Sequence, residues 1–212
     1  MHQKHKVSGI NLVVGKPSKW DGSKAIILGH GAGNGMNSPF MSFFHEGLEN
    51  AGFLTVKFNF PYIEKGRRAP DTQKTLRKTY SEVIDLVAAK YRPVNLVIGG
   101  KSMGGRVASY VAADSSLVSG LLFLGYPLHP PGRTDKLRDE HLYALKQSML
   151  FISGTRDALG KKDLLTRVVN RLGRRARIFW IEGGDHSLQI GKKDSVSLGT
   201  ALHEAESWLK QT

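Results

Sequence analysis

Cysteine is absent from this chain of 212 residues, which excludes disulfide bonds, thiolate metal sites and a cysteine nucleophile. Long apolar runs are also absent, since the longest one, LLFLGYPL, is far shorter than the roughly 20 residues of a membrane-spanning helix. No apolar secretory segment follows Met1, because the first 20 residues are polar and interrupted by glycine and proline. These absences lead us to expect a soluble, cytoplasmic protein.

Acidic residues are few compared with basic ones, and the formal net charge is +13. Such a charge permits binding to nucleic acid, acidic lipid or anionic substrates. The basic residues are dispersed, with local clusters at EKGRRAP and RLGRRAR, and no aromatic residues alternate with them as a single-strand stacking platform requires. We therefore favour a solvated basic surface, and nucleic-acid binding stays an alternative.

Short apolar runs alternate with longer helical patterns along the chain. The expected strands are 25–30, 53–60, 95–100, 118–127, 148–155 and 176–183, and the expected helices are 39–52, 71–90, 103–113, 139–146, 161–171 and 195–210. Apolar rather than alternating strands predict an α/β fold, a mostly parallel sheet with helices on both faces. With no repeat or linker, we expect one domain over 1–212, with 1–20 as a peripheral N-terminal segment. Ligands of such sheets bind at the carboxyl ends of the strands.

The stretch LVIGGKSMGGRVA, residues 96–108, matches two incompatible motifs. Its GKS resembles the end of a phosphate-binding loop, and its GKSMG is a G-x-S-x-G nucleophile elbow. The phosphate loop needs a glycine five positions before Gly100, where Asn95 stands, and residues 96–98 are apolar and strand-like. The next expected strand also ends without an acidic residue for Mg²⁺. The phosphate-loop interpretation therefore fails.

The nucleophile elbow requires a strand, a sharp turn that carries the serine, and a helix. NLVIGG supplies the strand and MGGRVASYVAA the helix, and Gly100 and Gly104 lack side chains that would clash with the turn. Ser102 is thus the candidate nucleophile. The alternative is a serine without chemistry in a glycine-rich turn, since the pentapeptide is weak evidence in a chain that holds 24 glycines.

A serine hydroxyl needs a histidine base that a carboxylate orients. In one known arrangement the acid and then the histidine follow the serine along the chain, each after its own strand. Asp157 follows SMLFISGT and His186 follows ARIFWIEG, the last expected strand. Asp157 as a helix N-cap, His186 as an exposed loop residue and Asp185 as the acid are the alternatives. Neighbouring loop residues generally point apart, which disfavours Asp185.

An oxyanion hole is the fourth part of such a site. It would use the backbone N–H of Met103, the residue after the nucleophile, and one from a loop after an early strand. LGHGAGNGMNS, residues 28–38, is that loop, and we expect Ala32 to supply the second donor, with Gly33 close behind. A phosphate cradle is the weaker alternative, because the G-x-G-x-x-G spacing is missing.

Six stretches together resemble the α/β hydrolase family, specifically its dienelactone-hydrolase-like branch and the small Tex-type and KANSL-type hydrolase-like proteins. They are LGHGAGNGMNSPFM, FNFPYIEKGRRAPD, GGKSMGGRVAS, GYPLHPPGR, FISGTRDALG and IEGGDHSL. The resemblance implies the α/β-hydrolase fold and a triad of Ser102, Asp157 and His186, but no particular substrate. Larger members insert a cap domain after the sixth strand. Here only 127–147 is available as a short lid, so we expect no large cap.

We therefore expect a serine hydrolase that cleaves an ester, thioester or related acyl bond of a small molecule, without a metal or organic cofactor. The expected substrate-binding residues are Gly33, Asn34, Arg68, Tyr126, Leu128, His129 and Leu188. Arg68, with its neighbour Arg67, would suit an anionic acyl group, and His129 has the alternative role of capping the Pro-Pro turn. A noncatalytic scaffold on the same fold remains an alternative, and the sequence does not predict an oligomeric state.

Overall fold

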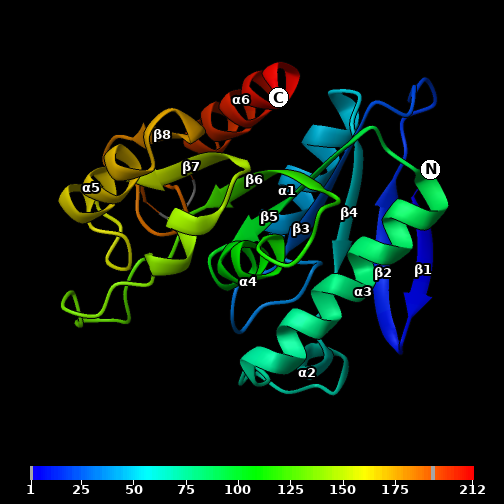
Figure 1. Cartoon of the computed structure of the whole chain (residues 1–212), viewed down its shortest axis with the longest axis horizontal. Coiled ribbons are helices and arrows are strands. Elements are labelled where there is room, and N and C mark those ends of the chain that lie inside the picture. Colours follow the sequence, from blue (N-terminus) through cyan, green and yellow to red (C-terminus); the bar gives the residue numbers. More distant parts are fainter. Residues whose placement is uncertain (1, 192–193) are drawn as a thin grey trace.

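An eight-stranded sheet runs through the part of the molecule that the computed structural model describes, residues 2–191 and 194–212 (Figure 1). The strands are β1 (Gln3–Val7), β2 (Ile10–Gly15), β3 (Lys24–Gly29), β4 (Leu54–Phe58), β5 (Asn95–Lys101), β6 (Val118–Leu124), β7 (Ser148–Gly154) and β8 (Ala176–Ile181). Their order is β1-β2-β4-β3-β5-β6-β7-β8. Only β2 pairs antiparallel, with β1 and β4, and the other neighbours are parallel. The expected α/β fold with a mostly parallel sheet is confirmed.

Helices cover both faces of this sheet (Figure 1). They are α1 (Pro39–Asn50), α2 (Pro61–Glu64), α3 (Gln73–Tyr91), α4 (Met103–Ala112), α5 (Lys162–Leu172) and α6 (Val196–Gln211), with short 3-10 turns at Glu140–Ala144 and Gly173–Arg175. Buried side chains of α3, α4 and α5 form one apolar core, and those of α1 and α6 form another on the opposite face. Within the described residues, no helix has the length and apolar character needed to cross a membrane.

The N-terminal residues depart most from the sequence prediction, because they form β1 and β2. In β2, Leu12 and Val14 are buried and belong to the core, while β1 is mostly exposed at the sheet edge. Most other elements lie within a few residues of their expected bounds. The expected helix over 139–146 is only the 3-10 turn Glu140–Ala144, and α2 was not expected.

Tyr80 of α3 fixes the two central strands to each other from within the core. Its buried hydroxyl accepts a hydrogen bond from the Gly99 N–H (3.0 Å), and the carbonyl oxygens of Ile27 and Gly99 lie 2.8 and 2.7 Å away. Burial raises the pKa of Tyr80, so the phenol stays protonated and can donate. A neutral polar group thus joins β3 to β5 just before the candidate nucleophile.

The contact between α4 and the end of β3 can be tested by adding one methyl group. A Cβ on Gly104 would lie less than 3.0 Å from backbone atoms of Gly29, which cannot move as a flexible side chain would. We expect Gly104→Ala to lower the free energy of unfolding by about 1–3 kcal/mol, measured by urea denaturation. Gly199 lies exposed in α6 with nothing near such a Cβ, so Gly199→Ala should raise it by up to about 1 kcal/mol. Equal effects of the two substitutions would contradict the tight contact.

Candidate active site

Ser102 stands in the sharp turn between β5 and α4 with a backbone conformation that is rare for a residue with a side chain, φ 48° and ψ −112°. Such strain persists only where the surroundings impose it. Here Gly100, at φ 140°, and Gly104 both approach Gly29 so closely that a Cβ on either would clash with its backbone. The elbow predicted from the glycine spacing is therefore present in the backbone.

Three side chains from three loops meet at this turn. His186 Nε2 lies 2.8 Å from Ser102 Oγ, and His186 Nδ1 lies 2.8 and 2.9 Å from the two carboxylate oxygens of Asp157. The carboxylate accepts a hydrogen bond from the Nδ1–H group, so Nε2 carries the lone pair that can accept a hydrogen bond from the serine hydroxyl. The structure thus brings together the three residues that the sequence order selected.

The other acid considered from sequence has a different position. Asp185 Oδ1 accepts hydrogen bonds from the backbone N–H of Ser187 (2.7 Å) and Gln189 (3.2 Å), so its carboxylate shapes its own loop. Asp157 also has a local role, since its Oδ1 accepts the N–H of Leu159 at 2.7 Å. The buried Asp157 therefore both faces His186 and organises the loop that carries it.

The loop after β3 lies beside the serine and is held by His30. This buried imidazole donates from Nδ1 to the Gly31 carbonyl oxygen (2.8 Å) and accepts the Phe60 N–H at Nε2 (3.1 Å). Burial lowers the pKa of His30 to about 4, which keeps the ring neutral and able to play both roles. A Cβ on Gly31 would lie 3.8 Å from the Ser102 Cβ, so the backbone of the expected oxyanion loop borders Ser102.

A cavity of about 420 Å³ opens over Ser102 and His186. Its lining residues are Gly31, Ala32, Asn34, Ser38, Pro39, Phe40, Met41, Lys101, Ser102, Leu159, His186, Ser187 and Gln189. Phe40, Met41 and Leu159 supply large apolar side chains to this lining. Lys101 supplies a cation, and none of the described lining residues carries a carboxylate. None of residues 127–147 contributes to it.

Of the seven expected substrate-binding residues, only Asn34 lines the cavity; Gly33 lies between the lining residues Ala32 and Asn34 without lining it. Arg68 is exposed in the turn after α2, away from the lining. The structure gives this exposed guanidinium no contact with the cavity over Ser102.

The other four expected residues turn into the protein interior. Tyr126, Leu128 and Leu188 are buried in the two cores, and the Tyr126 hydroxyl donates to the Arg138 carbonyl oxygen at 2.7 Å. His129 Nδ1 donates to the Pro130 carbonyl oxygen at 2.9 Å, which matches the alternative that it caps the Pro-Pro turn. Position after a strand identified the right edge of the sheet, but it did not give the direction of these side chains.

Lys101 is the cavity residue that sequence reasoning missed. Its Nζ donates to the carbonyl oxygen of His186 and lies 5.2 Å from the ring centroid of Phe40. Gly125 leaves room for the ammonium, because a Cβ there would lie 3.0 Å from Nζ. Burial lowers the pKa of Lys101 to about 8, and the negative charges of Asp157 and Asp185 oppose that shift. The signal that the sequence offers for Lys101 is its place directly before Ser102.

Comparison with known proteins agrees with this fold. A family model described as an alpha/beta hydrolase domain matches residues 22–212. A dienelactone hydrolase from Anabaena variabilis is similar in structure with a TM-score of 0.81 and 18% identity, over 99% of this chain and 98% of that one. An alpha-beta serine hydrolase homologue from Coxiella burnetii has a TM-score of 0.72 and 18% identity, over 99% of this chain and 95% of that one. A serine hydrolase without lid from Xanthomonas campestris has a TM-score of 0.72 and 16% identity, over 100% of this chain and 92% of that one.

The neutral state of His30 makes stability depend on pH. An unfolded histidine titrates near 6.5, so the unfolded chain takes up a proton on acidification that folded His30, with a pKa of about 4, does not. The free energy of unfolding should therefore fall from pH 7 to pH 5, with about 2 kcal/mol of the loss from His30. In urea denaturation, the free energy of unfolding of His30→Gln should fall by about 2 kcal/mol less than that of the wild type over the same pH change. His203→Gln, exposed in α6, should keep the wild-type loss, and a wild-type loss in His30→Gln would contradict the assignment.

Proposed function

Because this chain belongs to the α/β hydrolase family, we propose that it is a serine hydrolase that cleaves an ester, thioester or related acyl bond of a small molecule. The observation that carries the proposal is the chain of contacts from Ser102 Oγ to His186 Nε2 and from His186 Nδ1 to Asp157. A nucleophile, a base and an orienting carboxylate in this geometry are the parts that acyl transfer needs.

In the proposed first half-reaction, Ser102 Oγ attacks the acyl carbonyl carbon while His186 Nε2 takes the hydroxyl proton. Asp157 stays ionised and stabilises the imidazolium through Nδ1. The tetrahedral intermediate collapses, the bond to the leaving group breaks, and His186 returns the proton to that group. In the second half, water attacks the acyl-enzyme with His186 again as base, which releases the acid and restores the serine.

The negative charge of each tetrahedral intermediate needs donors that are already in place. We assign this role to the N–H of Met103, in the first turn of α4, and to that of Ala32, which lines the cavity. The free N–H groups at the start of α4 favour negative charge there. One such donor typically contributes about 3–4 kcal/mol to the stabilisation of the transition state.

The cavity limits the substrate to a small molecule with an apolar part. Its volume of about 420 Å³ is within the range of small-molecule pockets, and Phe40, Met41 and Leu159 offer apolar contacts. We propose that the site works without a lid from residues 127–147, since none of them lines it. The similarity to a structure described as a serine hydrolase without lid supports this view.

The first test is labelling with a fluorophosphonate probe, which reacts with activated serines. We expect the native protein to be labelled, and both Ser102→Ala and the heat-denatured wild type to remain unlabelled. Ser116→Ala, a change of an exposed serine on the loop after α4, should be labelled as the wild type is. Labelling of Ser102→Ala would place the reactive group elsewhere. No labelling of the folded wild type would favour the noncatalytic scaffold.

Lys101 should act on the reaction through His186. Lys101→Met keeps the apolar stem but removes the donor to the His186 carbonyl oxygen, and a hydrogen bond from a charged group contributes about 1.5–3 kcal/mol. We therefore expect kcat on a model ester to fall by about tenfold or more, with a smaller change in KM, because methionine keeps the apolar part of the Lys101 side chain in the cavity lining. Lys146→Met, an exposed lysine, is the matched control and should behave as the wild type.

The pH profile separates this role from a general loss of structure. Lys101 faces the carboxylates of Asp157 and Asp185 and the loop of His186. As pH rises through its pKa of about 8, the neutral amine becomes a weaker donor, so wild-type activity should decline there. The Lys101→Met variant should lack this decline. A variant with wild-type kcat and profile would remove Lys101 from the mechanism.

A further inference from the structure

We propose that His2, His45 and Glu49 form a binding site for a divalent metal ion such as Zn²⁺. One ligand atom of each residue lies within 4.8 Å of the others. His45 and Glu49 are one turn apart on α1, and His2 directly precedes β1. The lining of the serine-centred cavity reaches Met41 on α1, so the proposed site begins about 6 Å further along the helix, at His45, and ends about 12 Å along it, at Glu49. It is separate from the proposed reaction.

The buried side chain of His45 is the strongest evidence for the metal site. Its side chain is fully buried, and neither ring nitrogen has a hydrogen-bond partner among the residues that the structure describes. Buried polar atoms are nearly always paired. Burial, together with the positive charges of Lys57 and His2, lowers the pKa of His45 to about 3, so the ring is neutral and has a lone pair for a metal ion. A bound ion would satisfy one of these nitrogens.

The carboxylate of Glu49 lies against Gly15 of the neighbouring strand β2, where a Cβ would come within 2.5 Å of Glu49 Oε2. The same oxygen lies 2.7 Å from His2 Nε2. The rings of His2 and His45 have their centroids 5.0 Å apart. Both imidazoles and the carboxylate thus converge on one point between α1 and the start of β1.

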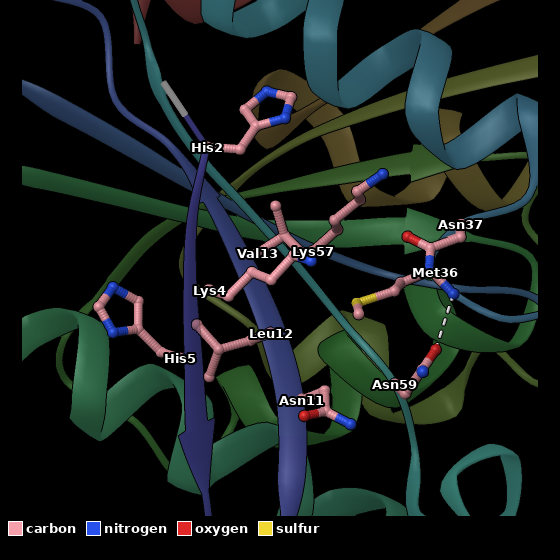
Figure 2. A pocket seen from close by; sticks show the side chains of 10 residues that line it. All are labelled: His2, Lys4, His5, Asn11, Leu12, Val13, Met36, Asn37, Lys57 and Asn59. Atoms are coloured by element: carbon pink, nitrogen blue, oxygen red, sulfur yellow. Dashed lines mark hydrogen bonds between the residues drawn. The ribbon is translucent and has the colours of Figure 1, made fainter.

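Two imidazoles and one carboxylate are a ligand set that Zn²⁺ accepts in tetrahedral geometry, with a fourth position for water. The positive charge of Lys57 opposes the binding of a cation at this site. Its ammonium lies near enough to His45 to lower the pKa of the ring, and it donates a hydrogen bond to Ser42 Oγ at 2.9 Å. Figure 2 shows Lys57 and His2 around the adjoining cavity of about 480 Å³. Removal of this charge should therefore strengthen binding of a cation.

The site would have a structural role. β1 lies at the edge of the sheet, where it pairs with β2 and is mostly exposed. A metal ion shared by His2 and α1 would tie the start of the strand to the helix. Because an ion that binds only the folded chain stabilises it by mass action, zinc should raise the melting temperature.

The test is calorimetric titration of the chelator-treated protein, freed of any purification tag, with zinc chloride. We expect one ion per chain and a rise in melting temperature. His2→Ala changes an exposed residue and should leave the fold intact while weakening binding at least tenfold, and Glu49→Gln should do the same. His203→Ala, an exposed histidine of α6, should bind as the wild type does. Lys57→Met should bind zinc more tightly.

Three outcomes of the zinc titration would overturn the metal site whether or not the protein is a hydrolase. These are no saturable binding by the wild type, equal affinity of wild type and His2→Ala, or an equal loss in His203→Ala, which would indicate scattered surface histidines. Fluorophosphonate labelling of His2→Ala should equal that of the wild type. A failed zinc titration would therefore overturn the metal site and leave the proposed hydrolase activity standing. Absence of fluorophosphonate labelling would count against the hydrolase and leave the zinc titration a valid test of the metal site.

Discussion

The close approach of three glycines is the constraint on which the site depends. Gly100 and Gly104 both lie against the backbone of Gly29, where no side chain fits. This contact lets β5 turn sharply into α4 and holds Ser102 at φ 48°. It also fixes the loop that starts at His30, because that residue follows Gly29 directly. This close approach therefore sets Ser102 and the expected oxyanion donors relative to each other.

The sequence predicted the parts of the site that depend on chain order. Ser102, Asp157 and His186 follow three strands whose carboxyl ends meet at one edge, and parallel sheets place such ends together. The cavity lining was predicted poorly, since Tyr126, Leu128 and Leu188 also follow strands but point into the cores. Side-chain direction depends on loop conformation, such as the positive φ of Leu188, and a single sequence does not contain this information.

Other differences have equally physical reasons. The strand β1 was missed because QKHKV is exposed at the edge and its polar composition gives no apolar run. The strand β2 does have an apolar run, INLVVG, but it lies between polar stretches in the segment that was expected to be peripheral. Lys101 was missed because a lysine beside a nucleophile becomes significant only when its Nζ is seen to reach the His186 carbonyl oxygen. Similarly, His45 looks like an ordinary helical histidine until burial without partners is established. Long-range contacts, rather than local pattern, define these residues.

The loop of Asp157 has a consequence for how the substrate range of such a protein can diverge. The N–H of Leu159 is bonded to the Asp157 carboxylate, while Leu159 also lines the cavity. A shift of the backbone at Leu159 would therefore move a wall of the cavity and the hydrogen-bond partner of Asp157 together. A change of the Leu159 side chain alone keeps the N–H and its hydrogen bond, unless proline replaces the residue. Variation of this side chain, or of the exposed Asn34 on the loop after β3, can thus reshape the cavity while the contact between Asp157 and His186 stays in place.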